Sequence, residues 1–520
     1  MKKVINSTKV GRRDRSPVPG QKKGRGTCPP LSIGLALIFF IYSAFILFQS
    51  VYDENGFITS DSSHYLQLAQ NILNGDGLST ANYVEGMSTY FATWPIGYPV
   101  LIAIISFLTG LSVVWASKLV NIICVGLCFV LLKRLFADRT LPVVFVFFIS
   151  TFTALFAYTW SEVPFLLGML WLVFSIVRYI ETNRMRYVFH LFFAAVFLFF
   201  MRYIGLIGAG IIGLVGFYYL FKKQWKPMLT CWVTGTLTFV VAGIYLAINY
   251  FQTGLATGME RIPRKETGAE FITMLKEAVL AEFNFLSVEI GDPLTISSIV
   301  LLVALVLFVR PRHVKALFTI RRSDFLIPGM FLFVGVVYFI GIVYMRATAY
   351  FDSFDFRLLG PATFMFALFL VSWIASVEKS AWRHWKNFLV VVFMVAFLNN
   401  IGIASYETWK SAAPSYKETV ADVQKDYEAI PYGSIVAFEN IHARYLRTDL
   451  QFIKVYFKPY FAEPESVGEF TDRISPHDAS GVYFQTKPIV YYDYDESFID
   501  MMEQAEEEGK KFIKLENVLD

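Results

Sequence analysis

Long apolar runs recur through most of this chain, and they constrain its fold more than any other feature. A helix needs roughly 20 mostly apolar residues to cross a lipid bilayer. The chain has 520 residues, of which 55% are hydrophobic and only 17% are charged, and this is too apolar for one soluble core. The sequence therefore predicts a polytopic α-helical membrane protein. The apolar runs lie at 31–51, 96–132, 141–158, 163–178, 187–221, 227–250, 294–309, 325–345, 357–376 and 387–405.

Two of these runs are too long for one helix. Run 187–221 is interrupted by MRYIG, which predicts two short spans with Arg202 and Tyr203 at their junction. Run 96–132 begins with IGYPVLIAIISFLTG, which is about 15 residues long and so falls below the length needed to cross. We expect this first part, 96–110, to lie at the membrane surface as a juxtamembrane helix.

The basic residues between the runs indicate which side each segment faces. If 96–110 does not cross, the basic clusters all fall on the side of the N-terminal tail, KKVINSTKVGRRDRSPVPGQKKGRG; if it crosses, every cluster moves to the opposite side. The positive-inside rule therefore favours about eleven spans with a cytoplasmic N-terminal tail (1–30) and an external C-terminus. A nucleic-acid partner for the tail is not favoured, because an apolar span follows it at once. The clusters are Lys133/Arg134, Arg184/Arg186, Lys222/Lys223/Lys226, Arg310/Arg312/Lys315/Arg321/Arg322 and Lys379/Arg383/Lys386.

This topology places three polar regions outside the cell membrane: a first external loop (51–95), a second long loop (251–293) and residues 406–520. The last region has dispersed charges and short β-type runs such as SIVAF, GVYFQ and PIVYY between helical patterns, which predicts a small extracytoplasmic α/β domain. The loop 251–293 contains AEFITMLKEAVLAEFNFL (269–286), apolar at helical spacing. We expect it to lie as a helix on the outer leaflet.

The first external loop contains the stretch TSDSSHYLQLAQNILNGDGLST, which predicts a short amphipathic helix closed by a Gly-Asp-Gly turn. Ser60 or Asp61 is expected to cap this helix, and capping alone would explain an aspartate there. Asp61, His64 and Tyr65 share its first turn, because residues three and four apart are neighbours on a helix. His64 can equally be a passive surface residue.

Three more isolated ionisable residues are expected on the same membrane face. Glu162, in AYTWSEVPFL, occupies a very short external turn; Arg202 interrupts an apolar hairpin; Arg357, in YFDSFDFRLLGP, precedes a late span. A carboxylate at membrane depth is costly unless it is paired, hydrated or metal-bound, whereas snorkelling also explains an interfacial arginine. Carboxylates can act as general bases or hold a divalent cation, and arginines grip phosphate. The set is typical of group transfer from a phosphorylated lipid carrier.

The order of these motifs resembles the membrane glycosyltransferases with the GT-C fold. It is most similar to the protein O-mannosyltransferase-like branch, which includes the bacterial aminoarabinose transferase acting on lipid A. The matching elements are DSSHY, LAQNILNGDGLS, WPIGYP, WSEVP, MRYIGL and FRLLGP, spread over 31–405, the expected GT-C-like transmembrane domain. The first loop lacks the Asp-Glu pair of the eukaryotic mannosyltransferases, so protein O-mannosylation is not implied.

The resemblance implies roles for individual residues. Asp61 would be the catalytic base or lie beside it, and Glu162 would assist directly or by holding, with Asp61, a divalent cation (Mg, Mn or Zn) where one is used. Arg202 and Arg357 would face the lipid phosphate. Further substrate-binding residues would be His64, Tyr65, Trp94, Tyr98 and Tyr203.

The sequence thus predicts an integral membrane glycosyltransferase. It would transfer a hexosyl or pentosyl group from a polyprenyl-phosphate-linked donor to a lipid, glycan or protein acceptor at the external face. Rival interpretations are a transporter or flippase of lipid-linked sugars, a polymerase or ligase of lipid-linked glycans, and an interaction module on an inert anchor. A transporter usually has midplane charges and a repeat between its halves, and the sequence has no such repeat.

Overall fold

The computed structural model describes residues 33–81, 88–259, 261–286, 293–320, 324–437, 440–456, 463–475, 482–486 and 494–515. The basic tail predicted for 1–30, the run PIVYY and the cluster residues Arg321 and Arg322 lie outside the described residues.

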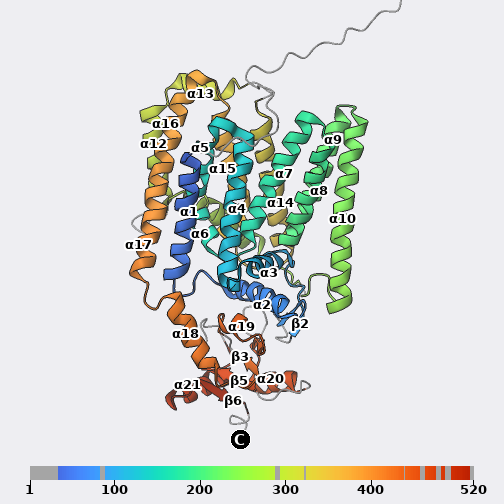
Figure 1. The fold of residues 1–520 in the computed structure, drawn as a ribbon, viewed down its shortest axis with the longest axis vertical. Coiled ribbons are helices and arrows are strands. Elements are labelled where there is room, and N and C mark those ends of the chain that lie inside the picture. Colours follow the sequence, from blue (N-terminus) through green and yellow to red (C-terminus); the bar gives the residue numbers. More distant parts are fainter. Residues whose placement is uncertain are drawn as a thin grey trace, which may run out of the picture.

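Apolar helices form a long bundle (Figure 1). Among the described residues, eight helices are long and apolar enough to cross a membrane, and a ninth is added if the helices Leu294–Phe308 and Pro311–Phe318, bent by 101°, form one span. The protein is therefore a multi-pass membrane protein; the number of eleven spans stays a prediction. The bundle comprises α1 (Ile33–Tyr52), α4 (Val113–Phe136), α7 (Glu162–Thr182), α8 (Met185–Met201), α9 (Ile207–Phe221), α10 (Trp225–Thr253), α12 (Pro293–Phe308), α13 (Pro311–Phe318), α14 (Leu326–Thr348), α15 (Phe356–Ala375), α16 (Lys379–Ala396) and α17 (Gly402–Lys410).

One path through the bundle is a broken helix. It consists of α5 (Thr140–Val144), a 3₁₀ turn η2 (Phe145–Phe148) and α6 (Ser150–Ala157), with Ile149 in extended conformation (ψ 140°) between the last two. The run of phenylalanines here is packed on all sides, and Tyr42 of α1 donates a hydrogen bond to the Phe152 carbonyl at 3.0 Å. A second irregularity, the wide helical turn η4 (Phe397–Ile401), separates α16 from α17.

The junction predicted at MRYIG is present as a tight hairpin. Helix α8 ends at Met201, Arg202 is extended, and a 3₁₀ turn η3 (Tyr203–Leu206) leads into α9. Gly97, at the start of α3 (Gly97–Thr109), lies against this hairpin. A Cβ atom there would lie 2.5 Å from the carbonyl oxygen of Phe200, so only glycine permits the contact.

Helices α2 (Ser60–Asn74) and α3 lie together at one end of the bundle (Figure 1). Helix α3 has 13 residues and so spans about 20 Å, short of the roughly 30 Å hydrocarbon core. Its length and place agree with the juxtamembrane helix predicted for 96–110. A short hairpin, β1 (Ser79–Ala81) with β2 (Ser88–Tyr90), follows α2.

The C-terminal region combines helices with one four-stranded sheet of order β4-β3-β5-β6. Strand β3 is parallel to both β4 and β5, and β6 is antiparallel to β5. Three buried phenylalanines, Phe470, Phe484 and Phe498, fill one side of it with ring centroids 5.4–5.9 Å apart. The elements are α18 (Tyr416–Tyr427), β3 (Ile435–Ala437), α19 (Ala443–Leu446), β4 (Gln451–Ile453), α20 (Val467–Ile474), β5 (Val482–Gln485), α21 (Glu496–Glu507) and β6 (Phe512–Lys514).

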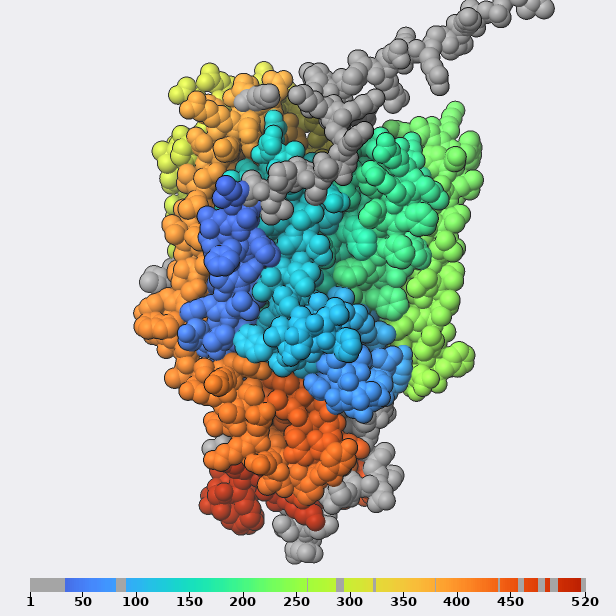
Figure 2. Space-filling model, viewed as in Figure 1, coloured from blue at the N-terminus to red at the C-terminus, as the bar shows by residue number. Residues whose placement is uncertain are grey.

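The C-terminal region packs against the first loop. In Figure 2 the orange and red surface of this region adjoins the blue surface of the α2–α3 end. Arg444 of α19 is buried and donates to the Gln67 side chain at 3.4 Å, and the His442 ring lies 3.3 Å from the Asn55 side-chain oxygen. Lys454 donates to the hydroxyl of Ser60 at 3.4 Å.

Candidate active site

Thr59 caps helix α2, in place of the Ser60 or Asp61 that the sequence suggested. The Thr59 hydroxyl oxygen accepts hydrogen bonds from the backbone N–H of Ser62 at 3.4 Å and from the indole N–H of Trp160 at 2.9 Å. Asp61 is therefore not needed as a cap, because a threonine one residue before the helix already fills that role. Its carboxylate is available to other parts of the chain.

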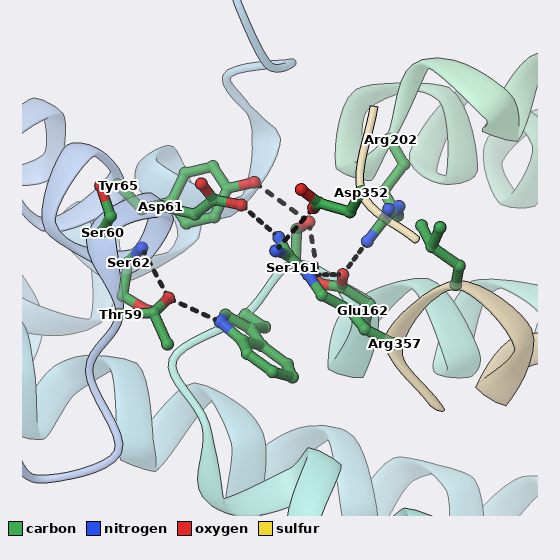
Figure 3. Close-up of polar contacts among 12 residues, drawn as sticks. Thr59, Ser60, Asp61, Ser62, Tyr65, Ser161, Glu162, Arg202, Asp352 and Arg357 are labelled. Atoms are coloured by element: carbon green, nitrogen blue, oxygen red, sulfur yellow. Dashed lines mark hydrogen bonds and ion pairs between the residues drawn. The ribbon is translucent and has the colours of Figure 1, made fainter. Parts of the chain in front are cut away.

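Arg357 joins the two carboxylates that the sequence places on one membrane face. Its guanidinium donates from Nη2 to Asp61 Oδ2 at 2.5 Å and from Nε to Glu162 Oε1 at 2.6 Å (Figure 3). Arg202 forms an ion pair with the same Glu162 oxygen. We call Asp61, Glu162, Arg202 and Arg357 the ion-pair cluster; the fold brings these residues together from α2, α7, the α8–η3 hairpin and α15.

The members of the ion-pair cluster differ in burial. The side chain of Glu162 is 0% exposed, whereas Asp61 is 19% exposed and Arg357 is 14% exposed. A buried carboxylate remains charged only when it is well paired, and Glu162 has two guanidinium groups and the Ser161 hydroxyl, which donates to Oε2 at 3.5 Å. Glu162 is thus the inner anchor of the cluster, and Asp61 is its accessible carboxylate.

Local structure at the start of α15 fixes Arg357. The Asp355 side chain accepts hydrogen bonds from the backbone N–H groups of Arg357 and Leu358, both at 3.0 Å. The Arg357 guanidinium carbon lies 4.8 Å from the centre of the Trp160 ring, within the range of a cation–π contact. Since Trp160 also donates to Thr59, the same indole contacts both the start of α2 and Arg357 and holds them next to each other.

Aromatic side chains support the cluster from inside the protein. The Tyr65 ring packs against Trp94 and Tyr98, with centroids 5.7 and 5.5 Å apart. The Tyr65 hydroxyl lies 3.4 Å from that of Ser161, and Tyr98 donates to Asn121 at 3.4 Å. Burial, together with the negative charges of Asp61 and Glu162, raises the pKa of Tyr65. Its phenol therefore stays protonated at neutral pH and can serve as a hydrogen-bond donor.

His64 and Tyr203 make their contacts elsewhere. The His64 ring packs on Trp94, with centroids 5.3 Å apart, and its Nδ1 lies 3.4 Å from a guanidinium nitrogen of Arg444. The Tyr203 hydroxyl donates to the Ala92 carbonyl at 2.6 Å and accepts from the Asn249 amide at 3.0 Å. These contacts tie α2 to the C-terminal region and the α8–α9 hairpin to the first loop.

The predicted cation ligands, Asp61 and Glu162, do not fit a metal ion as they are placed. The Arg357 guanidinium lies between their carboxylates and fills the position that a bridging cation would need. Within the described part of the chain, no group of three or more His, Cys, Asp or Glu side chains could hold a metal. We therefore assign no step to a metal ion.

No family model and no curated protein matches this chain. Two crystal structures of ArnT from Cupriavidus metallidurans do. The one bound to undecaprenyl phosphate aligns with a TM-score of 0.52 and 11% identity over 88% of this chain and 94% of ArnT. The apo structure aligns with a TM-score of 0.52 and 12% identity over 87% of this chain and 92% of ArnT. The chain has the GT-C fold. An oligosaccharyltransferase of Archaeoglobus fulgidus in complex with Zn and sulfate aligns with a TM-score of 0.48 and 9% identity over 87% of this chain and 68% of that protein. This likeness is too distant to inform this chain.

The GT-C fold confirms the fold expected from the motif order, and at this identity the likeness concerns the fold alone. Sequence reasoning did not find several residues that build the site, among them Thr59 and Trp160. Trp160 has a local signal, since it stands two positions before Glu162 in the quoted WSEVP motif. Asp355 also has one, because an acid two residues before Arg357 at a helix start is a typical cap. Arg444 has no local signal, since its partner His64 is 380 positions away.

Proposed function

We propose that this protein is an integral membrane glycosyltransferase that takes a sugar from a polyprenyl-phosphate-linked donor. The acceptor would be a lipid, glycan or protein at the external membrane face. The observation that carries the proposal is the single guanidinium of Arg357 bonded to both Asp61 and Glu162 at the α2–α3 end of a GT-C bundle.

The difference in burial supports different roles for the two carboxylates. Glu162 is fully buried and holds both arginines, so it would position them and would not meet the substrate. Asp61 is partly exposed and makes one ion pair with Arg357, so an incoming phosphate could replace it on that guanidinium. Arg202 and Arg357 would then bind the phosphate, and Asp61 would be released as a general base.

The reaction would be a single displacement. The acceptor hydroxyl gives its proton to the Asp61 carboxylate while its oxygen forms a bond to the anomeric carbon. The bond between that carbon and the phosphate oxygen breaks, and the leaving phosphate keeps the electron pair. Its growing negative charge is stabilised by the two arginines. Inversion at the anomeric carbon is what the family resemblance implies.

The test is release of undecaprenyl phosphate from undecaprenyl-phosphate-linked sugars by the purified full-length protein, with membrane lipid extract as acceptor. Asp61→Asn should reduce the rate at least about 100-fold, the range expected for a lost general base. Asp76→Asn is the matched control, because Asp76 is an exposed residue in the turn that ends the same helix. Equal rates for Asp61→Asn and wild type would refute the catalytic assignment.

The same assay separates the rival functions. A flippase would move labelled lipid-linked sugar between leaflets of a vesicle without cleaving it. Addition of EDTA, or of Mg²⁺, Mn²⁺ or Zn²⁺, tests the predicted cation independently. Reporters fused to the N-terminus of the full-length chain, ahead of 1–30, and after Asp520 test the proposed cytoplasmic N-terminus and external C-terminus.

A further inference from the structure

The segment after α11 (Gly268–Ala281) enters the helix bundle. The sequence predicts that all of 269–286 lies on the outer leaflet, but residues 282–286 turn inward and contact the break before α6. The Ser150 hydroxyl donates to the Asn284 carbonyl at 2.7 Å, and the Ser150 N–H donates to the Phe285 carbonyl at 3.3 Å. Because α6 has eight residues, Ser150 lies about 10 Å further into the bundle than the end of α6 at Ala157.

Asn400 holds the inserted segment, residues 282–286, in place through hydrogen bonds. It is fully buried in the wide turn η4, and its amide donates to the carbonyls of Phe148 and Phe285 at 2.6 and 2.8 Å. Three irregular stretches, around 148–150, 282–286 and 397–401, therefore meet inside the bundle. Irregular backbone at membrane depth is tolerated where it is buried in protein or lines a polar cavity.

A cavity of about 540 Å³ lies beside the inserted segment, and its volume falls within the range of small-molecule sites. Glu282 is at its wall and accepts a hydrogen bond from Thr151 at 3.4 Å. The side-chain oxygen of Asn284, another wall residue, is buried and has no hydrogen-bond partner among the described residues. The lining consists of Ser150, Thr151, Ala154, Ala278, Ala281, Glu282, Asn284, Leu286, Phe354, Asp355 and Phe356.

The lining indicates what could bind. None of the described lining residues is Lys or Arg, so the cavity offers a phosphate no cationic partner. Hydroxyl, amide and carboxylate oxygens can accept hydrogen bonds from a polyhydroxyl ring, and Phe354 and Phe356 offer apolar surface beside them. These features suit a neutral sugar ring.

The cavity adjoins the ion-pair cluster. Asp355 and Phe356 line it and directly precede Arg357, and consecutive Cα atoms are about 3.8 Å apart. A sugar attached to a phosphate on Arg357 would therefore be within reach of this cavity.

We propose that this cavity binds the glycosyl ring of the lipid-linked donor, with Glu282 and Asn284 recognising its hydroxyl groups. The inference rests on the proposed function and assigns its sugar subsite. The two ends of the donor would bind at different places. The arginines of the ion-pair cluster bind the phosphate, and the inserted segment forms hydrogen bonds with the sugar.

The test measures binding to the full-length protein in lipid nanodiscs. The probes are undecaprenyl phosphate and a panel of the same lipid carrying one neutral hexose or pentose. Wild type should bind at least one glycosylated probe about tenfold more tightly than the bare lipid phosphate. Glu282→Gln replaces the carboxyl group at the cavity wall with an amide, and Ala154→Leu fills the cavity without removing a polar group. Each should reduce that gain at least threefold and leave the binding of bare undecaprenyl phosphate unchanged.

Glu277→Gln is the matched control, because Glu277 is an exposed acid on α11. If both cavity variants bind every glycosylated probe as the Glu277 variant does, or if wild type binds all probes equally, the sugar subsite is refuted. A short alkyl glycoside that competes as well as the donor would assign the cavity to an acceptor sugar and overturn the donor assignment. Failure of the proposed function gives another result: no binding of undecaprenyl phosphate by wild type and no effect of Arg357→Lys.

Discussion

Arg357 and Asp61, 296 positions apart in the chain, form an ion pair at 2.5 Å at the end of the helix bundle. The same guanidinium also reaches Glu162 and lies over the ring of Trp160. A side chain with contacts on three sides has little freedom, so Arg357 is held in place before any ligand arrives. Such preorganisation is what phosphate recognition by a fixed guanidinium fork requires.

Replacement of Glu162 should destabilise the protein more than replacement of Asp61. Glu162→Gln leaves Arg202 and Arg357 without their shared buried counter-ion, and loss of one partner of a buried pair costs about 3–5 kcal/mol. Thermal unfolding in detergent measures the effect. Asp61→Asn should lower the melting temperature much less, since Asp61 is partly exposed. Equal destabilisation by the two variants would contradict the anchor role of Glu162.

Thr59→Ala should weaken both the start of α2 and its link to Trp160. Loss of a threonine cap costs about 1 kcal/mol, and the Trp160 indole N–H loses its acceptor as well. We expect a lower melting temperature. We also expect a several-fold lower transfer rate, because Asp61 lies in the first turn of α2, two residues after Thr59. Thr59→Ser keeps the hydroxyl and should restore both properties. A serine variant as impaired as the alanine variant would show that the hydroxyl is not the cause.

Asn400→Leu should release the inserted segment. The buried Phe148 carbonyl would lose its side-chain donor, and an unsatisfied buried group costs about 1–3 kcal/mol. The Phe285 carbonyl would keep only the bond from the Ser150 N–H. Limited proteolysis should then cleave near 282–286 faster than in wild type. Leu398→Ala, an exposed position in the same turn, is the control and should leave cleavage unchanged. Unaltered protection in Asn400→Leu would mean that other contacts hold the segment.

Acid should weaken the contact between the C-terminal region and the first loop through His442. Burial lowers the pKa of His442 to about 4, against roughly 6.5 in an unfolded chain. Between these values the unfolded state binds a proton that the folded state does not, so stability is greatest above pH 6.5 and falls as the pH drops towards 4, by up to about 3 kcal/mol.

Melting temperatures from pH 7.5 to 4.5 check this expectation. His442→Gln should flatten the curve, whatever its effect on absolute stability. The pKa of His64 is also lowered, by burial and then by the charges of Arg444 and Lys454, so His64→Gln provides a second variant for comparison. A wild-type curve that does not fall with acid would contradict the assignment.

The sequence predicted the parts of the molecule that depend on local pattern. Apolar runs located the helices, MRYIG located the hairpin at Arg202, and the length of 96–110 identified α3 as too short to cross. The convergence of Asp61, Glu162, Arg202 and Arg357 followed from sidedness, because isolated charges on one membrane face tend to be paired there.

Other features depend on contacts that no local pattern records. The choice of Thr59 over Asp61 as the cap is settled by Trp160, a residue 101 positions away. The inward turn of 282–286 depends on Ser150 and Asn400, whose neighbours look like ordinary membrane-span sequence. The predicted cation pair did not anticipate that an arginine could occupy the space between its two ligands.

The contacts between the C-terminal region and α2 also bear on the order in which the protein is made. Helix α2 leaves the ribosome early, but its partners Arg444 and Lys454 are synthesised some 380 residues or more after the His64 and Ser60 that they contact. The first loop therefore lacks these contacts during most of translation. A nascent chain released between residues 357 and 440 would contain every member of the ion-pair cluster and still lack the last supports of the helix that carries Asp61. Completion of this site is an event at the end of biosynthesis.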